Sequence, residues 1–235
     1  MLLVYQISRE YIHLHSKAGN RNRMAEKLSD IQELPEVVHE QKNELYPVFL
    51  KLDLFETLVV GAGNVGFEKL KSLLSNSPNA VITVVAPRVS GEIEILLSAY
   101  PQCKIIKRAF RDSDLDNKRI VVCATDQAEL HREIKLLANQ RGILVNVADT
   151  PELCDFYLGS IVQKGSLKIA ISTNGKSPTI AKRMKEIIEG LIPLEMENVL
   201  DNLRTIRNRM KGSFQEKVKR LNELTKELVK QGYED

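Results

Sequence analysis

Short apolar runs alternate along the middle of the chain with segments of helical periodicity. A parallel strand covered on both faces is apolar along its whole length, so the runs rich in Val and Ile are predicted as strands. These runs are 57–60, 80–86, 119–124 and 143–147, with a shorter candidate at 104–107. Helical spacing of apolar residues predicts helices over 65–75, 91–100 and 130–140. The alternation predicts an α/β fold, a Rossmann-like doubly wound parallel sheet whose ligands bind beyond the carboxyl ends of the strands.

The pattern changes in the last third of the chain. Two β-branched segments, 160–162 and 167–172, predict a hairpin that turns at Lys164-Gly165. Ser177-Pro178 has the residue types of an N-cap and a first helical position, so a helix is predicted to begin there. Apolar residues then form two amphipathic helical stripes, which are expected to pack on each other. The stripes span 199–210 and 214–228.

A glycine motif, Gly61-Ala62-Gly63-Asn64-Val65-Gly66, joins the first predicted strand to the first predicted helix. In this setting each glycine has a separate role. Gly61 makes the tight turn, Gly63 lets the backbone approach a pyrophosphate, and Gly66 lets helix and strand pack closely. The helix N-terminus offers free N–H groups to the phosphates. The motif therefore favours dinucleotide binding over a purely structural turn.

One feature of many NAD sites is missing. An acidic residue about 20 positions beyond the glycines usually holds the ribose hydroxyls at the end of the second strand. Here that place reads Val85-Ala86-Pro87-Arg88. Arg88 is suited to meet a 2′-phosphate or to stack on adenine, so NADP stays open beside NAD.

The composition is that of an ordinary globular protein, with 43% apolar and 28% charged residues in 235. No stretch approaches the roughly 20 apolar residues of a membrane span, and the apolar start lacks the basic residues of a signal peptide. Three scattered cysteines predict neither a disulfide framework nor a zinc site. We therefore expect a cytoplasmic protein that binds no membrane.

Charge is nearly balanced, and the net value of +3 does not indicate nucleic-acid binding. Residues 182–230 hold twelve Lys/Arg against eight Asp/Glu. A solvated helical face explains this excess more simply than a positive wall facing a polyanionic ligand. Residues 1–44 show no clear period beyond a short helix candidate at 24–39, and their histidines have no evident partners for a metal site.

Several segments in a fixed order resemble the precorrin-2 dehydrogenase/sirohydrochlorin ferrochelatase family of siroheme synthesis. The segments are Tyr46–Leu50, Gly61–Gly66, Thr83–Pro87, Ala124–Asp126, Asn146–Asp149 and Ala170–Pro178. The glycine motif is generic, whereas the last two of these segments are much more specific to the family. The resemblance extends over residues 45–191.

The resemblance implies a domain order and a reaction. It implies a Rossmann domain that binds NAD (45–152), a small α+β dimerisation domain (153–192) and a C-terminal helical domain (193–235). Residues 1–44 lie outside the resemblance and are expected to form an N-terminal extension, poorly ordered or packed as an arm. Members of this family form homodimers with exchanged elements and use NAD to oxidise precorrin-2 to sirohydrochlorin. Many then insert ferrous iron, as substrate, to give siroheme. One branch keeps the dehydrogenase and lacks the chelatase.

The resemblance also assigns residues. The family's catalytic aspartate corresponds to Asp149, for which a turn residue before Pro151 is the alternative interpretation. Together with the glycine turn and the strand ends, the predicted cofactor residues are Gly61, Gly63, Asn64, Val65, Gly66, Pro87, Arg88, Thr125 and Asp126. The predicted substrate residues are Ser172, Thr173, Asn174, Gly175 and Lys176. No metal ligand is predicted, since the tetrapyrrole itself would receive the iron.

Two other classes of protein stay open. A sensing module that binds NAD without chemistry does not require the Asn174–Pro178 loop or the basic helical tail. An ordinary dehydrogenase of a small alcohol or acid usually has a Tyr/Lys or His base in its substrate half, and here no histidine follows His131.

Overall fold

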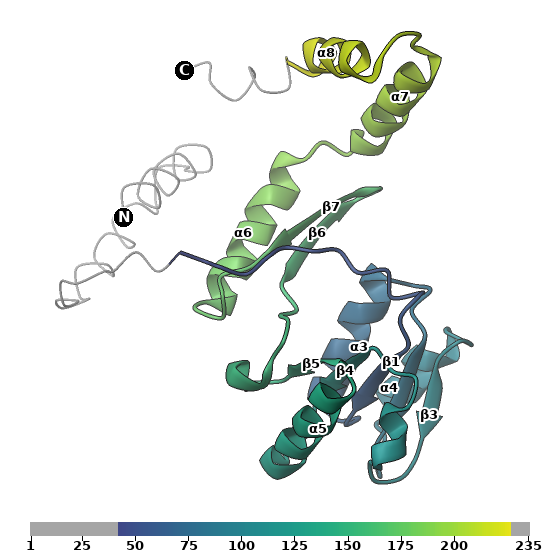
Figure 1. Ribbon diagram of the computed structural model, residues 1–235, viewed down its shortest axis with the longest axis vertical. Coiled ribbons are helices and arrows are strands. Elements are labelled where there is room, and N and C mark those ends of the chain that lie inside the picture. The colour runs from purple at the N-terminus through teal and green to yellow at the C-terminus, as the bar shows by residue number, and fades with distance from the viewer. Residues whose placement is uncertain (1–41, 227–235) are drawn as a thin grey trace, which may run out of the picture. The chain divides into compact units, whose positions relative to one another are not determined.

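The computed structural model describes residues 42–226, and the chain divides into two units at residues 44 and 45 (Figure 1). The helix candidate at 24–39 lies outside the described residues. Residues 42–50 contain no helix or strand and lead into the sheet that follows. None of the helices within residues 42–226 is both long enough and apolar enough to cross a membrane.

A five-stranded parallel sheet forms the centre of the described chain. Its strands lie in the order β3-β2-β1-β4-β5, and every neighbouring pair is parallel. Their bounds are β1 Thr57–Val60, β2 Ile82–Val85, β3 Lys104–Ile106, β4 Ile120–Cys123 and β5 Leu144–Val147. The order runs outward from β1 in both directions, so the predicted doubly wound sheet is confirmed.

Helices cover both faces of this sheet because alternate strand residues point to opposite sides. Val59 packs in one apolar cluster with residues of α3 and α4. Leu58 and Val60 pack in a second cluster with residues of α5. The helices are α3 Asn64–Asn76, α4 Gly91–Ser98 and α5 Ala128–Gln140, with short 3₁₀ turns η1 Asp112–Leu115 and η2 Pro151–Leu153.

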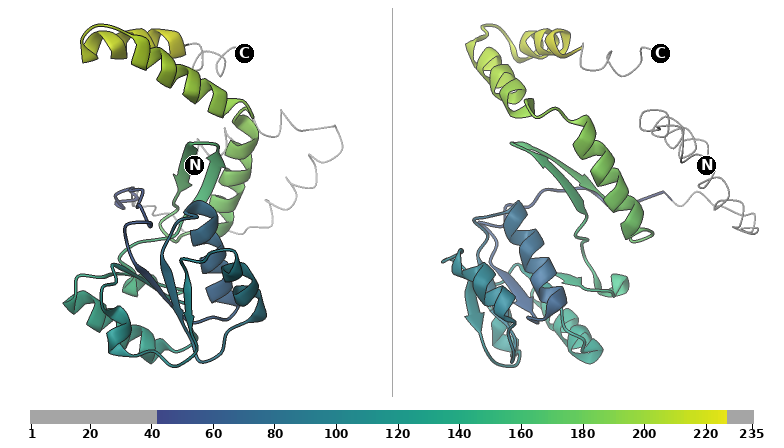
Figure 2. Two further views of the ribbon diagram at one scale, coloured as in Figure 1. Left: turned by 90° about the vertical axis from the view of Figure 1, so that its right-hand side faces the viewer. Right: turned by 180° about the vertical axis from the view of Figure 1, so that it is seen from behind.

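A hairpin and a helix follow the sheet. Strands β6 (Ser160–Lys164) and β7 (Leu167–Ile171) are antiparallel, and α6 (Pro178–Leu191) packs along them (Figure 2). The predicted turn position is one residue too early. Lys164 still pairs with Leu167, and Gly165 takes the positive φ of 56° that the turn needs.

The predicted start of α6 is confirmed. The Ser177 Oγ accepts the N–H of Ile180 at 3.2 Å, and Pro178 occupies the first helical position. Proline is favoured there because its missing N–H would have no partner inside the helix.

The last two described helices, α7 (Met196–Arg209) and α8 (Phe214–Thr225), contact each other as expected. Neither helix has a buried residue, however, and Phe214 is 81% exposed. The two stripes therefore contact each other but enclose no core within the described part of the single chain, because two short helices cannot cover each other's apolar faces.

Candidate active site

The glycine turn after β1 has the geometry that its sequence predicts. Gly61 has φ of +106°, and a Cβ there would lie 2.4 Å from the carbonyl oxygen of Ala124. A Cβ on Gly66 would lie 2.4 Å from the carbonyl oxygen of Gly61. Both positions therefore exclude any side chain. Around Gly63, in contrast, no heavy atom lies within 4 Å of a Cβ, so this position is open to a ligand.

Helix α3 begins directly at this turn, and Gly63 is its N-cap without any side-chain hydrogen bond. The first backbone bond of the helix runs from the Phe67 N–H to the Gly63 carbonyl at 2.9 Å. The N–H groups before Phe67 therefore have no intrahelical partner. Asn64 and Val65 are exposed beside them, which gives a helix N-terminus suited to an anion.

A small pocket of about 60 Å³ adjoins the glycine turn at the carboxyl edge of the sheet. It brings together three residues that the sequence assigns to the cofactor, Gly61, Pro87 and Thr125. The exposed side chains of Arg88 and Asp126 follow Pro87 and Thr125 but do not line the pocket. Sequence reasoning placed Ala86 at this edge but missed other lining residues. They include Ala109, Phe110, Gln127 and Leu130. Ala109 and Phe110 follow β3, so the rule that ligands bind beyond the carboxyl ends of the strands could have pointed to them.

Thr125 is held by a buried histidine that the sequence interpretation did not assign. Its Oγ1 lies 2.8 Å from Nε2 of His131 on α5 and accepts the N–H of Gln127 at 3.2 Å. Burial lowers the pKa of the His131 imidazole, and the charge of Asp126 opposes that effect. The hydrogen bond with His131 orients Thr125 beside Gly61.

Asp149 lies on the same edge of the sheet. It follows β5 by two residues, and β4 separates β5 from the strand that carries the glycine turn. Val60, Cys123 and Val147 are level in the register of these three strands, so their carboxyl ends meet. Asp149 is exposed and has φ of +57°, a left-handed conformation that aspartate tolerates better than most residues. The turn that the alternative interpretation expected is present, and it presents the carboxylate to solvent.

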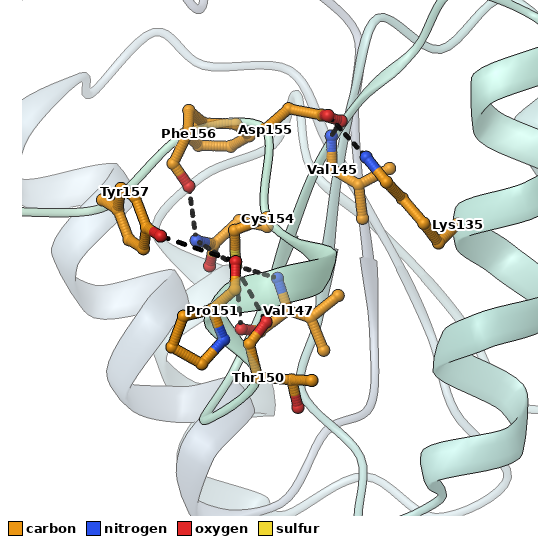
Figure 3. A network of polar contacts seen from close by, with 10 residues as sticks. Lys135, Val145, Val147, Thr150, Pro151, Cys154, Asp155, Phe156 and Tyr157 are labelled. Carbon is orange, nitrogen blue, oxygen red and sulfur yellow. Dashed lines mark hydrogen bonds and ion pairs between the residues drawn. The ribbon is translucent and has the colours of Figure 1, made fainter. Parts of the chain in front are cut away.

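The segment after Asp149 returns along the free edge of β5 (Figure 3). The N–H of Asp155 donates to the Val145 carbonyl at 2.8 Å, and its Oδ2 accepts the Val145 N–H at 2.9 Å. Lys135 of α5 forms an ion pair of 2.5 Å with the other carboxylate oxygen of Asp155. The amide of Asn146 donates to the carbonyl of Phe156 at 2.8 Å. These contacts fix the end of β5, from which Asp149 extends.

The predicted substrate loop lies between β7 and α6 and is closed by its own hydroxyl groups. The Thr173 Oγ1 accepts the Ser177 N–H at 3.2 Å and donates to the Ser177 carbonyl at 3.1 Å. The Ser172 Oγ accepts the N–H of Asn174 at 3.2 Å. Asn174 and Gly175 have φ of 52° and 75°, and Lys176 is exposed. Thr173 therefore shapes the loop, and Asn174 and Lys176 present its accessible polar side chains.

Within residues 42–226, no three His, Cys, Asp or Glu side chains lie together in a way that would hold a metal ion.

Two protein families match successive parts of this chain. The family described as "Putative NAD(P)-binding" matches residues 48–160, which include the whole sheet, the glycine turn and Asp149. The family described as "Sirohaem biosynthesis protein central" matches residues 164–191, which include β7, the polar loop and α6. The first match establishes an NAD(P)-binding domain at the sheet.

A solved structure decides the relationship. The structure of "SirC, precorrin-2 dehydrogenase" is similar with a TM-score of 0.63 and 31% identity, over 77% of this chain and 89% of that one. This chain belongs to the precorrin-2 dehydrogenase family. The resemblance read from its motifs is confirmed.

Several curated siroheme synthases are also similar to this chain. That of Psychrobacter arcticus is 39% identical over 148 residues, which are 63% of this chain and 26% of the relative. That of Thioalkalivibrio sulfidiphilus is 38% identical over 150 residues, 64% of this chain and 30% of the relative. That of Nitrosomonas europaea is 32% identical over 168 residues, which are 72% of this chain and 35% of the relative. The chain thus matches about a third or less of the length of these relatives.

Proposed function

We propose that this chain oxidises precorrin-2 to sirohydrochlorin with NAD as the hydride acceptor. The observation that carries the proposal is the placement of Asp149 on the sheet edge that also bears the glycine turn. Membership of the precorrin-2 dehydrogenase family supports the choice of substrate.

The residues at the sheet edge fit a dinucleotide. The open space at Gly63 admits a pyrophosphate, and the uncapped N-terminus of α3 offers it N–H groups. Pro87 and Thr125 line the adjoining pocket, next to the Phe110 ring. NAD, when bound, supplies the acceptor for a hydride. NAD is proposed ahead of NADP because the family uses it, and Arg88 is the residue that would favour the 2′-phosphate.

Asp149 is proposed as the base of the reaction. Oxidation removes two hydrogens from the macrocycle, one as a hydride to the cofactor and one as a proton. The exposed Asp149 carboxylate is free to accept that proton, since it follows β5 at the edge where the cofactor is expected. Conversion to sirohydrochlorin then leaves the proton on Asp149, from which solvent removes it.

The polyanionic substrate requires positive charge. Precorrin-2 carries many carboxylates, and Lys176, Lys182 and Arg183 lie in the loop and the first turns of α6. The N-terminus of α6 adds its dipole to these cations. We therefore assign Ser172–Lys176 to substrate binding, with Thr173 acting through the shape of the loop.

Residues 153–192 are proposed to form a dimerisation domain, and residues 193–235 a helical domain. Helix α6 and the segment that follows it leave large apolar side chains exposed beyond the Rossmann core. Leu191 is 70% exposed and Leu194 81%. A second copy of the chain would cover such side chains symmetrically.

Insertion of ferrous iron into sirohydrochlorin is the second candidate activity. The same exposed Asp149 carboxylate is positioned to accept pyrrole N–H protons as iron, the substrate, enters the ring. The sheet edge therefore suits both reactions. The chelatase proposal requires Asp149 to be the proton acceptor in iron insertion as well as in oxidation.

Purified protein incubated with precorrin-2 and NAD tests the proposal. The absorption spectrum should change to that of sirohydrochlorin with formation of one NADH per product, and later addition of ferrous iron tests chelation. NAD binding without turnover would identify a sensing module instead. Turnover of small alcohols or acids in place of precorrin-2 would identify an ordinary dehydrogenase.

A further inference from the structure

A single sulfur atom contacts both ends of the turn that carries Asp149. The Sγ of Cys154 accepts the N–H of Val147 at 3.2 Å (Figure 3). As a donor it lies 3.2 Å from the Val147 carbonyl and 3.4 Å from the Thr150 carbonyl. Val147 is the last residue of β5 and Thr150 precedes η2, so the contacts enclose Ala148 and Asp149.

Cys154 is itself held in place. The short η2 turn leads to it, and its N–H donates to the Pro151 carbonyl at 3.0 Å. The next residue, Asp155, is fixed by two backbone contacts with Val145 and by the ion pair with Lys135. The sulfur therefore joins a rigid anchor to the turn.

The protonated thiol is the form that these contacts need. Burial is the main cause that raises the pKa of Cys154, so the S–H group is retained at neutral pH and donates to one carbonyl at a time. Sulfur is a weak hydrogen-bond partner. The sulfur nevertheless accepts the Val147 N–H, and the Asn146 amide at 3.6 Å, while it donates to one of the two carbonyls, so it restricts the turn more than any single contact would.

The turn needs such restraint because Asp149 has a left-handed backbone. With φ of +57°, this residue occupies a region that L-amino acids adopt only infrequently. Such conformations persist only where the surroundings hold them, and they gather at functional sites. Without the thiol, the turn would relax and the direction of the carboxylate would change.

We propose that Cys154 is a positioning residue, whose thiol holds the Val147–Thr150 turn and so aims the Asp149 carboxylate at the substrate. This proposal rests on the proposed function of Asp149 as the base. Nothing in it requires Cys154 to touch the substrate or the cofactor. An alternative is that Cys154 only fills space against the apolar cluster beside α5, where it is partly buried.

The activities of matched variants distinguish whether Cys154 positions Asp149 or only fills space in the apolar cluster. A misplacement of about 1 Å can cost roughly a hundredfold in rate, so Cys154→Ala should lower kcat by at least tenfold. Its KM for NAD should stay unchanged, because the glycine turn is not involved. Cys154→Ser keeps a donor and an acceptor and should recover most of the rate. The control is Cys103→Ala, since Cys103 is also partly buried but lies against the other face of the sheet, 3.7 Å from the Ala80 carbonyl.

A double variant tests whether the thiol acts through the carboxylate. If it does, Cys154→Ala should cause no further loss when Asp149 is already replaced by Asn. Losses that multiply would overturn the proposal, as would a Cys154→Ala rate within twofold of the Cys103→Ala rate. If Cys154→Ala does not fold, Cys154→Val takes its place, since valine fills a similar volume and cannot hydrogen-bond through its side chain.

Amide hydrogen exchange gives a result that does not depend on the reaction. In Cys154→Ala, the peptide covering 147–154 should exchange at least tenfold faster than in Cys103→Ala. Equal exchange in the two variants would overturn the proposal even in an active enzyme. If the wild-type protein does not oxidise precorrin-2, the proposed function fails, and exchange still decides whether Cys154 holds the turn.

Discussion

At the scale of single residues, the three glycines of the turn have different consequences. A Cβ on Gly61 or Gly66 would lie 2.4 Å from backbone atoms, whereas Gly63 faces open space. The turn role of Gly61 and the packing role of Gly66 therefore follow from the protein structure without a ligand. The role of Gly63 concerns a ligand and needs a binding experiment.

Replacing Gly63 by Val should weaken NAD binding and leave the fold intact. A branched side chain fits the empty space at Gly63 but occupies the path of the pyrophosphate. We expect at least a tenfold rise in the Kd for NAD by calorimetric titration, with an unchanged circular dichroism spectrum. Gly66→Val is the contrasting variant, because its side chain meets the Gly61 carbonyl and should destabilise the protein itself. Unchanged NAD affinity in Gly63→Val would contradict the assigned role.

Replacing His131 by Gln should reduce the dependence of stability on pH. Burial holds the pKa of His131 below the value of about 6.5 that it has in the unfolded chain. The unfolded state therefore binds the proton more readily. The stabilisation is fully present above about pH 6.5 and is lost as pH falls through the lower folded-state pKa. Between pH 7.5 and 5, the Tm of the wild type should fall more than that of His131→Gln; parallel curves would show that His131 does not titrate in this way.

The sequence predicted some of these residues and missed others for a physical reason. The glycines and Asp149 belong to local motifs, in which neighbours along the chain define the geometry. His131, Phe110 and Cys154 act through contacts that the fold creates. The contact of Cys154 with Val147, for example, requires the chain to return along β5, which no local pattern encodes.

At the scale of elements, the alternation of strands and helices was sufficient to predict the sheet. Buried parallel strands are apolar throughout, and the pattern that this creates is strong. The boundaries were less certain, as the position of Gly165 in the hairpin turn shows. The contact between α7 and α8 was predicted from their apolar stripes, but a helical stripe shows only that an apolar face needs a partner. It does not show whether that partner lies in the same chain.

The exposed apolar residues after the sheet lead to a prediction about assembly. Leu191 of α6 is 70% exposed, and a dimer interface would bury it. Light scattering at micromolar concentration should give twice the chain mass of 26.6 kDa. Leu191→Asp should shift the mass toward that of one chain. Leu136→Asp is the control, because Leu136 is similarly exposed, at 61%, but lies on α5 of the Rossmann domain. A wild-type monomer, or equal behaviour of the two variants, would contradict this interface.

At the scale of the whole molecule, one sheet edge carries the features that the proposed reaction needs. The order of the strands brings the glycine turn, Thr125 and Asp149 to neighbouring positions, although Asp149 follows Gly61 by 88 positions in the chain. The polar loop before α6 belongs to a different part of the chain and contributes Asn174 and Lys176. The proposed reaction therefore depends on whether Asp149 acts as its base.

The rate of precorrin-2 oxidation by Asp149→Asn tests this claim most directly. Asparagine tolerates the left-handed backbone of Asp149, so the variant removes the base and preserves the turn. Loss of a general base typically costs roughly 10²–10⁴-fold in rate. We expect a loss of this size under saturating NAD, with an unchanged Kd for NAD, and a similar loss of iron insertion if the chain performs it. Oxidation of precorrin-2 by Asp149→Asn within twofold of the wild-type rate would contradict the account.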